Sequence, residues 1–344
     1  MNSPANGSVR VAQVGCGYWG KNLVRNFSEI GALEAVSDLD PETTERFASQ
    51  YSVRGMTFAD VMSEPTIDAV AFATPAPLHA SQARLAMENG KHVFLEKPLA
   101  LTTEDALELK SVIAETGRTL MVGHLLQYHP IFAHLRTMVQ NGDLGDVEYV
   151  YSNRLSLGKV RIEENVLWSF APHDLSMILS LVGEKPNKVR AQGHSMQTDG
   201  IEDYVLVTLG FENGAKGHVQ VSWNHPFKEQ RLTVIGSKAM AVFEDSLTEW
   251  GSKLAIYRHT FERTNGVPVP SKADAEYPEI PIGEPLKNQC QHFVDSIANG
   301  TRPRTDVDEG LAVLQVLEQA EFDLAKARGS IDPETPYQFP GQTA

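Results

Sequence analysis

The sequence predicts a two-domain α/β protein: a doubly wound parallel sheet, followed by an α+β domain with a large, open and mostly antiparallel sheet. Three observations support this prediction. Short apolar runs alternate with amphipathic stretches up to about residue 124, strands dominate from residue 147, and 344 residues suffice for two domains. We therefore expect residues 1–124 to form the first domain and residues 125–344 the second.

The first domain reads as short strands joined by helices of ordinary length, the pattern of βαβ units with right-handed crossovers. Two helix starts carry capping signals, Asp40 before Pro41 and Thr102 before an acidic first turn. The expected strands are 9–14, 33–37, 69–74, 92–95 and 119–123, and the expected helices are 18–30, 41–51, 78–89 and 103–117.

The second domain reads mainly as strands, some of them joined by hairpin signals such as Glu212-Asn213-Gly214. Residues 262–283 contain four prolines and are expected to form a surface loop. The expected strands are 147–155, 188–193, 204–211, 215–222, 231–235, 240–243 and 254–257, and the expected helices are 130–141, 174–181, 285–298 and 307–328.

Composition narrows the class of protein. Thirty Lys+Arg against 44 Asp+Glu give a net charge of −14, which argues against a nucleic-acid partner. No apolar run approaches the roughly 18 residues of a membrane span, and the first eight residues lack the apolar centre of a secretory signal. Two cysteines, Cys16 and Cys290, are too few for a zinc cluster. We expect a cytoplasmic protein without a metal site.

A glycine motif follows the first predicted strand and opens the first predicted helix. Residues 15–20 read Gly-Cys-Gly-Tyr-Trp-Gly, which fits the G-x-G-x-x-G pattern in the context that a dinucleotide site requires. Gly15 permits a tight turn, Gly17 lets the backbone approach a pyrophosphate, and Gly20 lets the helix pack closely on the strand. The alternative is a glycine-rich turn without a ligand.

Two further segments are expected to border the same cofactor. Asp38 ends the second strand, where an acid binds a ribose diol, and the following Leu39-Asp40 offers no cation for a 2′-phosphate. NAD is therefore preferred over NADP. Thr74 and Pro75 follow a buried strand, and ligands of such sheets lie beyond the strands' carboxyl ends. The alternative for this segment is a loop stiffened by proline.

Glu96-Lys97-Pro98 ends another strand of the same sheet. A lysine there points toward the expected nicotinamide, and the nearby positive charge and partial burial should lower its pKa. Lys97 is thus a candidate for proton transfer or for donating a hydrogen bond to a substrate oxygen. The alternative is a surface lysine in a loop.

Taken together, these motifs and a later His173-Asp174 resemble the glucose-fructose oxidoreductase/inositol dehydrogenase/MocA (Gfo/Idh/MocA) family, from Val9 to about Arg328. The Glu-Lys-Pro triplet is the most diagnostic of them. The resemblance implies a Rossmann domain and a second domain whose large sheet often forms the oligomer interface, hence a homodimer or homotetramer. It also implies NAD-dependent oxidation or reduction of sugars and related polyols.

The resemblance also assigns roles to residues. Lys97 and His173 would flank the reacting hydroxyl. Many family members carry an aspartate four residues before that histidine, where this chain has Ser169, so an Asp–His–Lys relay is weakened and His173 is the better base. The candidate cofactor-binding residues are Gly15, Gly17, Tyr18, Trp19, Gly20, Asp38, Thr74, Pro75, His79, Glu96 and Lys97.

A cluster of cations suggests an anionic substrate. Residues 153–161 hold three cations in an acidic chain, and arginine matches carboxylate and phosphate groups. The alternative is a solvated sheet edge. The candidate substrate-binding residues are Lys97, Gln127, Tyr128, Asn153, Arg154, Lys159, Arg161, Trp168 and His173; for Gln127 and Tyr128 the alternative is packing at the domain junction.

Within the family, these segments most resemble dehydrogenases of nucleotide-linked sugars, notably UDP-N-acetylglucosaminuronate 3-dehydrogenases of surface-polysaccharide pathways. That resemblance implies oxidation of a sugar C3 hydroxyl, with His173 and Lys97 assisting. Three alternatives stay open: a keto-sugar reductase or a free-sugar or inositol dehydrogenase, a non-catalytic NAD sensor, and an enzyme that oxidises and re-reduces its substrate in one cycle.

Overall fold

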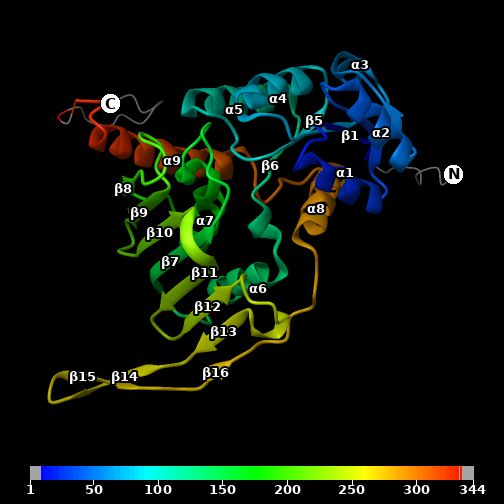
Figure 1. The fold of residues 1–344 in the computed structure, drawn as a ribbon. Coiled ribbons are helices and arrows are strands. Elements are labelled where there is room, and N and C mark those ends of the chain that lie inside the picture. The colour runs from blue at the N-terminus through cyan, green and yellow to red at the C-terminus, as the bar shows by residue number, and fades with distance from the viewer. Residues whose placement is uncertain (1–8, 333, 335–344) are drawn as a thin grey trace. The chain divides into compact units, whose positions relative to one another are not determined.

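The computed structural model describes residues 9–332 and residue 334, and these form two compact units (Figure 1). The first unit contains the described residues up to His129 together with Gly283–Leu314. The second contains Pro130–Ile282 and the described residues of Gln315–Gln338. The sequence suggests a single boundary at residue 124, whereas the packing returns Gly283–Leu314 to the first unit.

The first unit is built on a parallel sheet of six strands within the described residues, in the order β3-β2-β1-β4-β5-β6. Its strands are β1 (Val11–Val14), β2 (Leu33–Ser37), β3 (Arg54–Gly55), β4 (Ala69–Phe72), β5 (His92–Leu95) and β6 (Leu120–Val122). Helices flank this sheet (Figure 1): α1 (Gly20–Glu29), α2 (Pro41–Tyr51), α3 (Phe58–Ser63), α4 (His79–Glu88), α5 (Thr103–Thr116) and α8 (Pro285–Asn299), with short 3-10 turns η1 (Ala76–Leu78) and η2 (Leu125–Tyr128).

The core of the first unit explains why α8 belongs to it. Cys290 and Phe293 on α8 are fully buried among apolar side chains of α1, β1, β4 and β5. The ring of Phe293 meets the rings of Phe27 and Phe94 edge to face, at centroid distances of 6.3 and 5.7 Å. Apolar burial of this kind, rather than position along the chain, decides which unit α8 joins.

The predicted helix caps in this unit are confirmed. The Asp40 side chain accepts hydrogen bonds from the Glu42 and Thr43 backbone N–H groups at the start of α2. The Thr102 side chain accepts from the Asp105 N–H at the start of α5, which ends at Gly117 in a left-handed conformation. Local side-chain chemistry thus fixes these helix ends, as the sequence indicates.

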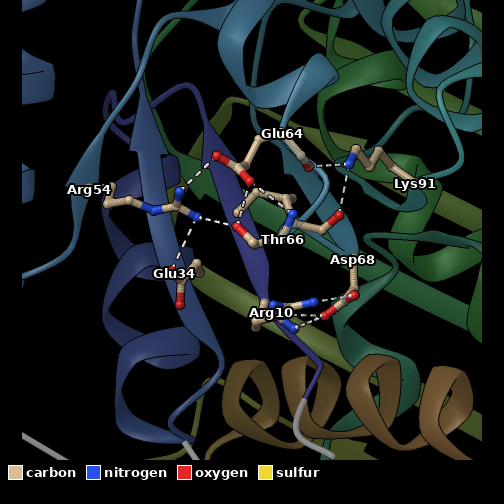
Figure 2. A network of polar contacts seen from close by, with 8 residues as sticks. Arg10, Glu34, Arg54, Glu64, Thr66, Asp68 and Lys91 are labelled. Atoms are coloured by element: carbon tan, nitrogen blue, oxygen red, sulfur yellow. Dashed lines mark hydrogen bonds and ion pairs between the residues drawn. The ribbon is translucent and has the colours of Figure 1, made fainter. Parts of the chain in front are cut away.

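Charged side chains tie the strand starts together (Figure 2). The Arg10 guanidinium holds both oxygens of Asp68, and Arg54 pairs with Glu64 at 2.9 Å. The buried Lys91 ammonium donates to the Glu64 and Ile67 carbonyls. These bonds anchor the segment that enters β4. The ligand-binding edge of such a sheet is the opposite one, at the carboxyl ends.

The second unit is built on a sheet of eight strands within the described residues, in the order β16-β13-β12-β11-β7-β10-β9-β8. Only the β7–β10 pair is parallel among the described pairs of this sheet. Its strands are β7 (Val147–Leu157), β8 (Lys188–His194), β9 (Tyr204–Gly210), β10 (Lys216–Ser222), β11 (Asn224–Gly236), β12 (Met240–Glu244), β13 (Leu254–Tyr257) and β16 (Ala275–Glu276). The predicted fold class is confirmed.

Helices cover one face of this sheet. α7 (Val166–Val182) packs on β7, β9 and β10, and α6 (Pro130–Gln140) packs on β12 and α7. Because side chains alternate along a strand, Ser152 and Arg154 of β7 face α7, while Tyr151 and Asn153 face the other side. The remaining elements are the short turn η3 (Trp250–Ser252) and α9 (Val307–Ala327), which belongs to the first unit up to Leu314 and to the second from Gln315.

Several elements differ from the sequence prediction, among them β11, which begins at Asn224 rather than at residue 231. α7 begins eight residues earlier than expected, with Pro172 inside the helix. The expected loop 262–283 instead contains β14 (Thr260–Thr264), β15 (Val267–Ser271) and β16; β14 and β15 form a separate, fully exposed hairpin around Asn265-Gly266 (Figure 1). The short β3 and α3 were not anticipated. In the part of the chain that is described, no helix has the length and apolarity to cross a membrane.

Candidate functional site

The glycine loop forms a tight turn at the centre of the parallel sheet, where the strand order reverses between β1 and β4. Gly15 has a φ of +83°, and a Cβ there would lie 2.7 Å from the Ala73 carbonyl oxygen. A Cβ on Gly20 would lie 1.9 Å from the Gly15 oxygen. At Gly17 nothing lies within 4 Å, so the loop backbone is open on that side. This geometry suits a bulky anion that approaches the backbone closely.

Asp38 follows β2 and is fixed beside this loop. One carboxylate oxygen accepts a hydrogen bond from the Cys16 N–H at 2.7 Å, and the other accepts from the Asp40 N–H at 3.1 Å. The Asp38 N–H donates to the Thr44 hydroxyl. Burial raises the pKa of the neighbouring Cys16 thiol to about 12, so this cysteine is an uncharged filler. The carboxylate is held in place, with acceptor capacity left for a ligand.

A cavity of about 1110 Å³ joins these elements in the first unit. Its lining includes Gly15, Gly17, Asp38, Thr74 and Pro75. Sequence reasoning missed the opposite wall, which is formed by Gly55, Met56, Thr57 and Phe58, the residues that follow or end β3 and begin α3. A two-residue edge strand leaves too short a pattern to detect. Four acids, Asp38, Glu45, Asp60 and Glu64, also line the cavity.

These observations test whether a dinucleotide fits. The open face of Gly17 suits the pyrophosphate, the anchored Asp38 suits a ribose diol, and the cavity beside them has room for an adenosine. The acidic lining opposes the extra phosphate of NADP. The residues present therefore fit NAD.

We predict that Asp38→Asn weakens NAD binding by about tenfold, because a charged acceptor of ribose hydroxyl groups becomes a neutral one. Asparagine keeps the shape and one acceptor for the Cys16 N–H. The same substitution should narrow the preference for NAD over NADP, as isothermal titration with each nucleotide would measure. Glu45→Gln, which also removes a carboxylate from the cavity lining, is the matched control. Equal losses in both variants would contradict a specific role for Asp38.

His79 links the loops that follow β4 and β5. Its ring is buried, with Nδ1 2.7 Å from the Pro98 carbonyl oxygen and Nε2 2.9 Å from the Thr74 carbonyl oxygen. Burial lowers the pKa of His79, and the two carbonyl contacts act against that shift. The Thr74 hydroxyl donates to the Gln82 amide oxygen at 2.6 Å. His79 thus joins the loops that follow β4 and β5.

Glu96 and Lys97 lie at the carboxyl end of β5. The Trp19 indole N–H donates to Glu96 Oε1 at 2.5 Å, and the Lys97 N–H donates to Oε2 at 3.3 Å. Burial raises the pKa of Glu96 to about 7. Lys97 is partly buried, and the Lys97–Pro98 peptide bond is cis. The structure therefore brings the glycine loop, Thr74, Glu96 and Lys97 to one edge of the sheet.

The other residues expected in the first unit differ in their environment. Tyr18 is exposed, and the Lys21 ammonium lies 5.3 Å from its ring centre. Gln127 and Tyr128 are buried in η2. The Tyr128 hydroxyl lies 2.9 Å from the Thr305 hydroxyl, and the Gln127 carbonyl accepts from Arg304. These contacts of Gln127 and Tyr128 lie within the first unit.

In the second unit the expected substrate residues do not form one group. The Arg154 guanidinium is buried and pairs with Asp174 at 2.5 Å, while Asn153, on the other face of the sheet, donates to Glu229. Arg161 pairs with Glu164 in an exposed loop. Arg154 therefore pairs with a carboxylate of its own chain through Nε and one terminal nitrogen.

Lys159, Trp168 and His173 lie on or just before α7. Lys159 is exposed, the Trp168 indole N–H donates to Glu321 at 3.1 Å, and His173 is partly buried one turn after Ser169. Asp174, its neighbour, is buried inside the helix rather than at a cap. Within the described residues, no three His, Cys, Asp or Glu side chains are placed to hold a metal ion.

Comparison with known proteins gives two family matches that together span most of the chain. Residues 9–124 match the Gfo/Idh/MocA oxidoreductase family, described as having an NAD-binding Rossmann fold. Residues 132–242 match the Gfo/Idh/MocA C-terminal domain.

Curated relatives and solved structures agree with these matches. UDP-N-acetylglucosamine 3-dehydrogenase of Acidithiobacillus ferrooxidans is 29% identical over 215 residues, covering 62% of this chain and 67% of that protein. Its solved structure superposes with a TM-score of 0.79 at 26% identity, covering 92% of this chain and 98% of that one. The scyllo-inositol 2-dehydrogenase (NAD(+)) of Bacillus subtilis is 27% identical over 324 residues, covering 87% of this chain and 90% of that protein.

Proposed function

The chain belongs to the Gfo/Idh/MocA family of NAD-binding oxidoreductases, as its motifs predict, and on that premise we propose that it oxidises a sugar hydroxyl at C3 of a UDP-linked N-acetylated sugar or uronate. The observation that carries this proposal is the position of Lys97. It follows β5 at the edge of the sheet where the glycine loop and the Thr74 loop also lie. A relative 29% identical to this chain is named for the same C3 chemistry on UDP-N-acetylglucosamine.

In the proposed reaction the chain supplies the proton acceptor. Bound NAD would supply the acceptor for the hydride of the carbinol carbon. His173 accepts the hydroxyl proton, because imidazole titrates near neutral pH, and the Lys97 ammonium donates a hydrogen bond to the same oxygen. Ser169 stands where many relatives have an aspartate, so no carboxylate at that position supports the imidazole.

A second candidate keeps the same residues and changes the substrate. The sequence alignment with a scyllo-inositol 2-dehydrogenase covers 87% of this chain, a larger share than the 62% that aligns in sequence with the sugar-nucleotide enzyme. Arg154, one of the three cations expected to meet an anionic substrate, pairs with Asp174. Both facts favour an uncharged polyol or free sugar, oxidised or formed by reduction of the keto compound.

The experiment that decides is a substrate panel read by nicotinamide absorbance. UDP-N-acetylglucosamine and its uronate should give NADH at rates well above those for glucose, myo-inositol and scyllo-inositol. Faster turnover of the inositols would replace the first candidate by the second. Loss of substrate with no net NADH would indicate oxidation followed by re-reduction with the cofactor retained.

We also propose that the protein is a homodimer or homotetramer joined through the sheet of the second unit. The face opposite α7 carries Tyr149, Tyr151 and His218 in mutual contact, with the Tyr151 and His218 rings stacked at 5.0 Å. These side chains are partly exposed, and partly exposed aromatic clusters are typical of interfaces. Light scattering should then give a mass of two or four times 37.9 kDa.

A further inference from the structure

A hydrogen bond connects the glycine loop to the carboxyl end of β5. The Trp19 indole nitrogen lies 2.5 Å from Glu96 Oε1. Trp19 belongs to the segment that turns between β1 and α1, and its ring is partly exposed. Glu96 follows β5, beyond β4 in the sheet. The bond therefore spans the central strands at the edge where the dinucleotide is expected to lie.

We propose that this Trp19–Glu96 hydrogen bond is a proton-controlled latch: the Glu96 carboxylate holds the glycine loop in its binding conformation, and protonation of Glu96 loosens the loop and weakens dinucleotide binding. The proposal concerns the cofactor site of the first unit alone. It would stand even if the sugar chemistry proposed above failed.

The space around Glu96 is shaped for its carboxylate. A Cβ on Gly123, at the end of β6, would lie only 2.8 Å from Glu96 Oε2 and 3.0 Å from its Cδ. Any larger residue at position 123 would displace the carboxylate. Oε2 also accepts from the Lys97 N–H at 3.3 Å. The side chain is therefore confined on the side away from Trp19, which directs Oε1 toward the indole.

Charged and titratable groups reach Glu96 from each neighbouring element. Lys97 follows it in the same loop, and His124 lies at the start of η2, where it pairs with Glu309 of α9 at 2.6 Å. From α8, the Cys290 thiol interacts with it electrostatically: burial first, and then the charge of Glu96, raise the pKa of that thiol. Burial raises the pKa of Glu96 itself to about 7, although Trp19, Lys97 and His124 act in the opposite direction.

The protonation state of Glu96 sets the direction in which pH changes the dinucleotide affinity. Above neutral pH Glu96 is a carboxylate, and a charged acceptor bonds an N–H about twice as strongly as a neutral one. As the pH falls through about 7 the carboxyl group gains its proton, and the bond to Trp19 weakens. Dinucleotide affinity should therefore be higher at pH 8 than at pH 6.

ADP-ribose is a suitable probe, because it has the pyrophosphate that the glycine loop would bind but no nicotinamide. By isothermal titration, its affinity for the full-length protein should be about fivefold weaker at pH 6 than at pH 8. Glu96→Gln keeps the size and an acceptor without titrating, so its affinity should not change over this range. Trp19→Phe keeps a ring and removes the donor, and it should behave likewise.

Glu88→Gln serves as the matched control, because Glu88 is an exposed carboxylate at the end of α4 that pairs with Arg84. In Glu88→Gln, the affinity for ADP-ribose should change with pH as it does in the wild type. The proposal would be overturned if the wild-type affinity were the same at pH 6 and pH 8. It would also be overturned if the affinity still changed with pH in both Glu96→Gln and Trp19→Phe. A dependence seen with NAD but absent with ADP-ribose would also overturn it, because the nicotinamide charge would then be the cause.

A spectroscopic measurement tests the latch without any ligand. In protein labelled with ¹⁵N-tryptophan, the Trp19 indole N–H signal, assigned by its loss in Trp19→Phe, should shift with a midpoint near pH 7. The shift should vanish in Glu96→Gln. An indole signal that stays constant from pH 6 to pH 8 would contradict the proposal even if affinity changed with pH.

Discussion

Lys97→Met is expected to lower the turnover number by about 10²–10⁴-fold at pH 8, a far larger effect than any change in NAD affinity, since a positioned acid or base contributes rate enhancement of that size. The expectation rests on the place of Lys97 beside Glu96 at the carboxyl end of β5. Methionine keeps the length of the side chain and removes only its ammonium group. Steady-state kinetics with a substrate from the panel above, together with titration of NAD, would separate the two effects.

Two further variants complete this test. Lys110→Met removes an exposed lysine of α5 that pairs with Asp308, and it should leave turnover within the error of the wild type. His173→Asn should reduce turnover to a similar degree as Lys97→Met, and the double variant should lose little more, because residues that act on one proton are not additive. Turnover of Lys97→Met within threefold of the wild type would contradict the assignment.

The fold could be predicted wherever local chemistry decides it. Some features depend only on residues that are close in the sequence: the helix caps at Asp40 and Thr102, and the hairpin turn at Asn213-Gly214. The sequence predicts only 174–181 of α7, whereas apolar burial on both sides of Pro172 sustains a helix from Val166. The prolines of residues 262–283 predict a loop, whereas the structure forms the hairpin β14–β15 with its turn at Asn265-Gly266.

The candidate site divides in the same way. The conformation of the glycine loop depends on residues that are close in the sequence. Its turn and its closeness to β4 could therefore be inferred from the spacing of the glycines alone. The partner of a charged side chain is a matter of tertiary structure. Arg154 meets Asp174 and Asn153 meets Glu229 only because β7, α7 and β11 pack in one particular register. No count of cations along the sequence could show that Arg154 is already neutralised.

Asp174→Asn is expected to lower the free energy of unfolding of the second unit by about 3–5 kcal/mol, because it leaves the buried Arg154 charge without its counter-ion. Asp174 is fully buried on α7, and it also accepts a hydrogen bond from the Ser152 hydroxyl of β7. The pair therefore joins α7, which carries His173, to the sheet beneath it. Urea unfolding followed by tryptophan fluorescence would measure the change.

The tryptophan fluorescence can be restricted to the second unit. Trp168, Trp223 and Trp250 belong to the second unit, so a Trp19→Phe background confines the signal to it. Glu276→Gln, in an exposed pair with Arg258, should change stability little. Replacing both partners, as Arg154→Met with Asp174→Leu, should recover much of the loss, since the cost arises from an unpaired buried charge. If the double replacement were as unstable as Asp174→Asn, packing rather than charge would hold α7, and the position of His173 would depend on shape alone.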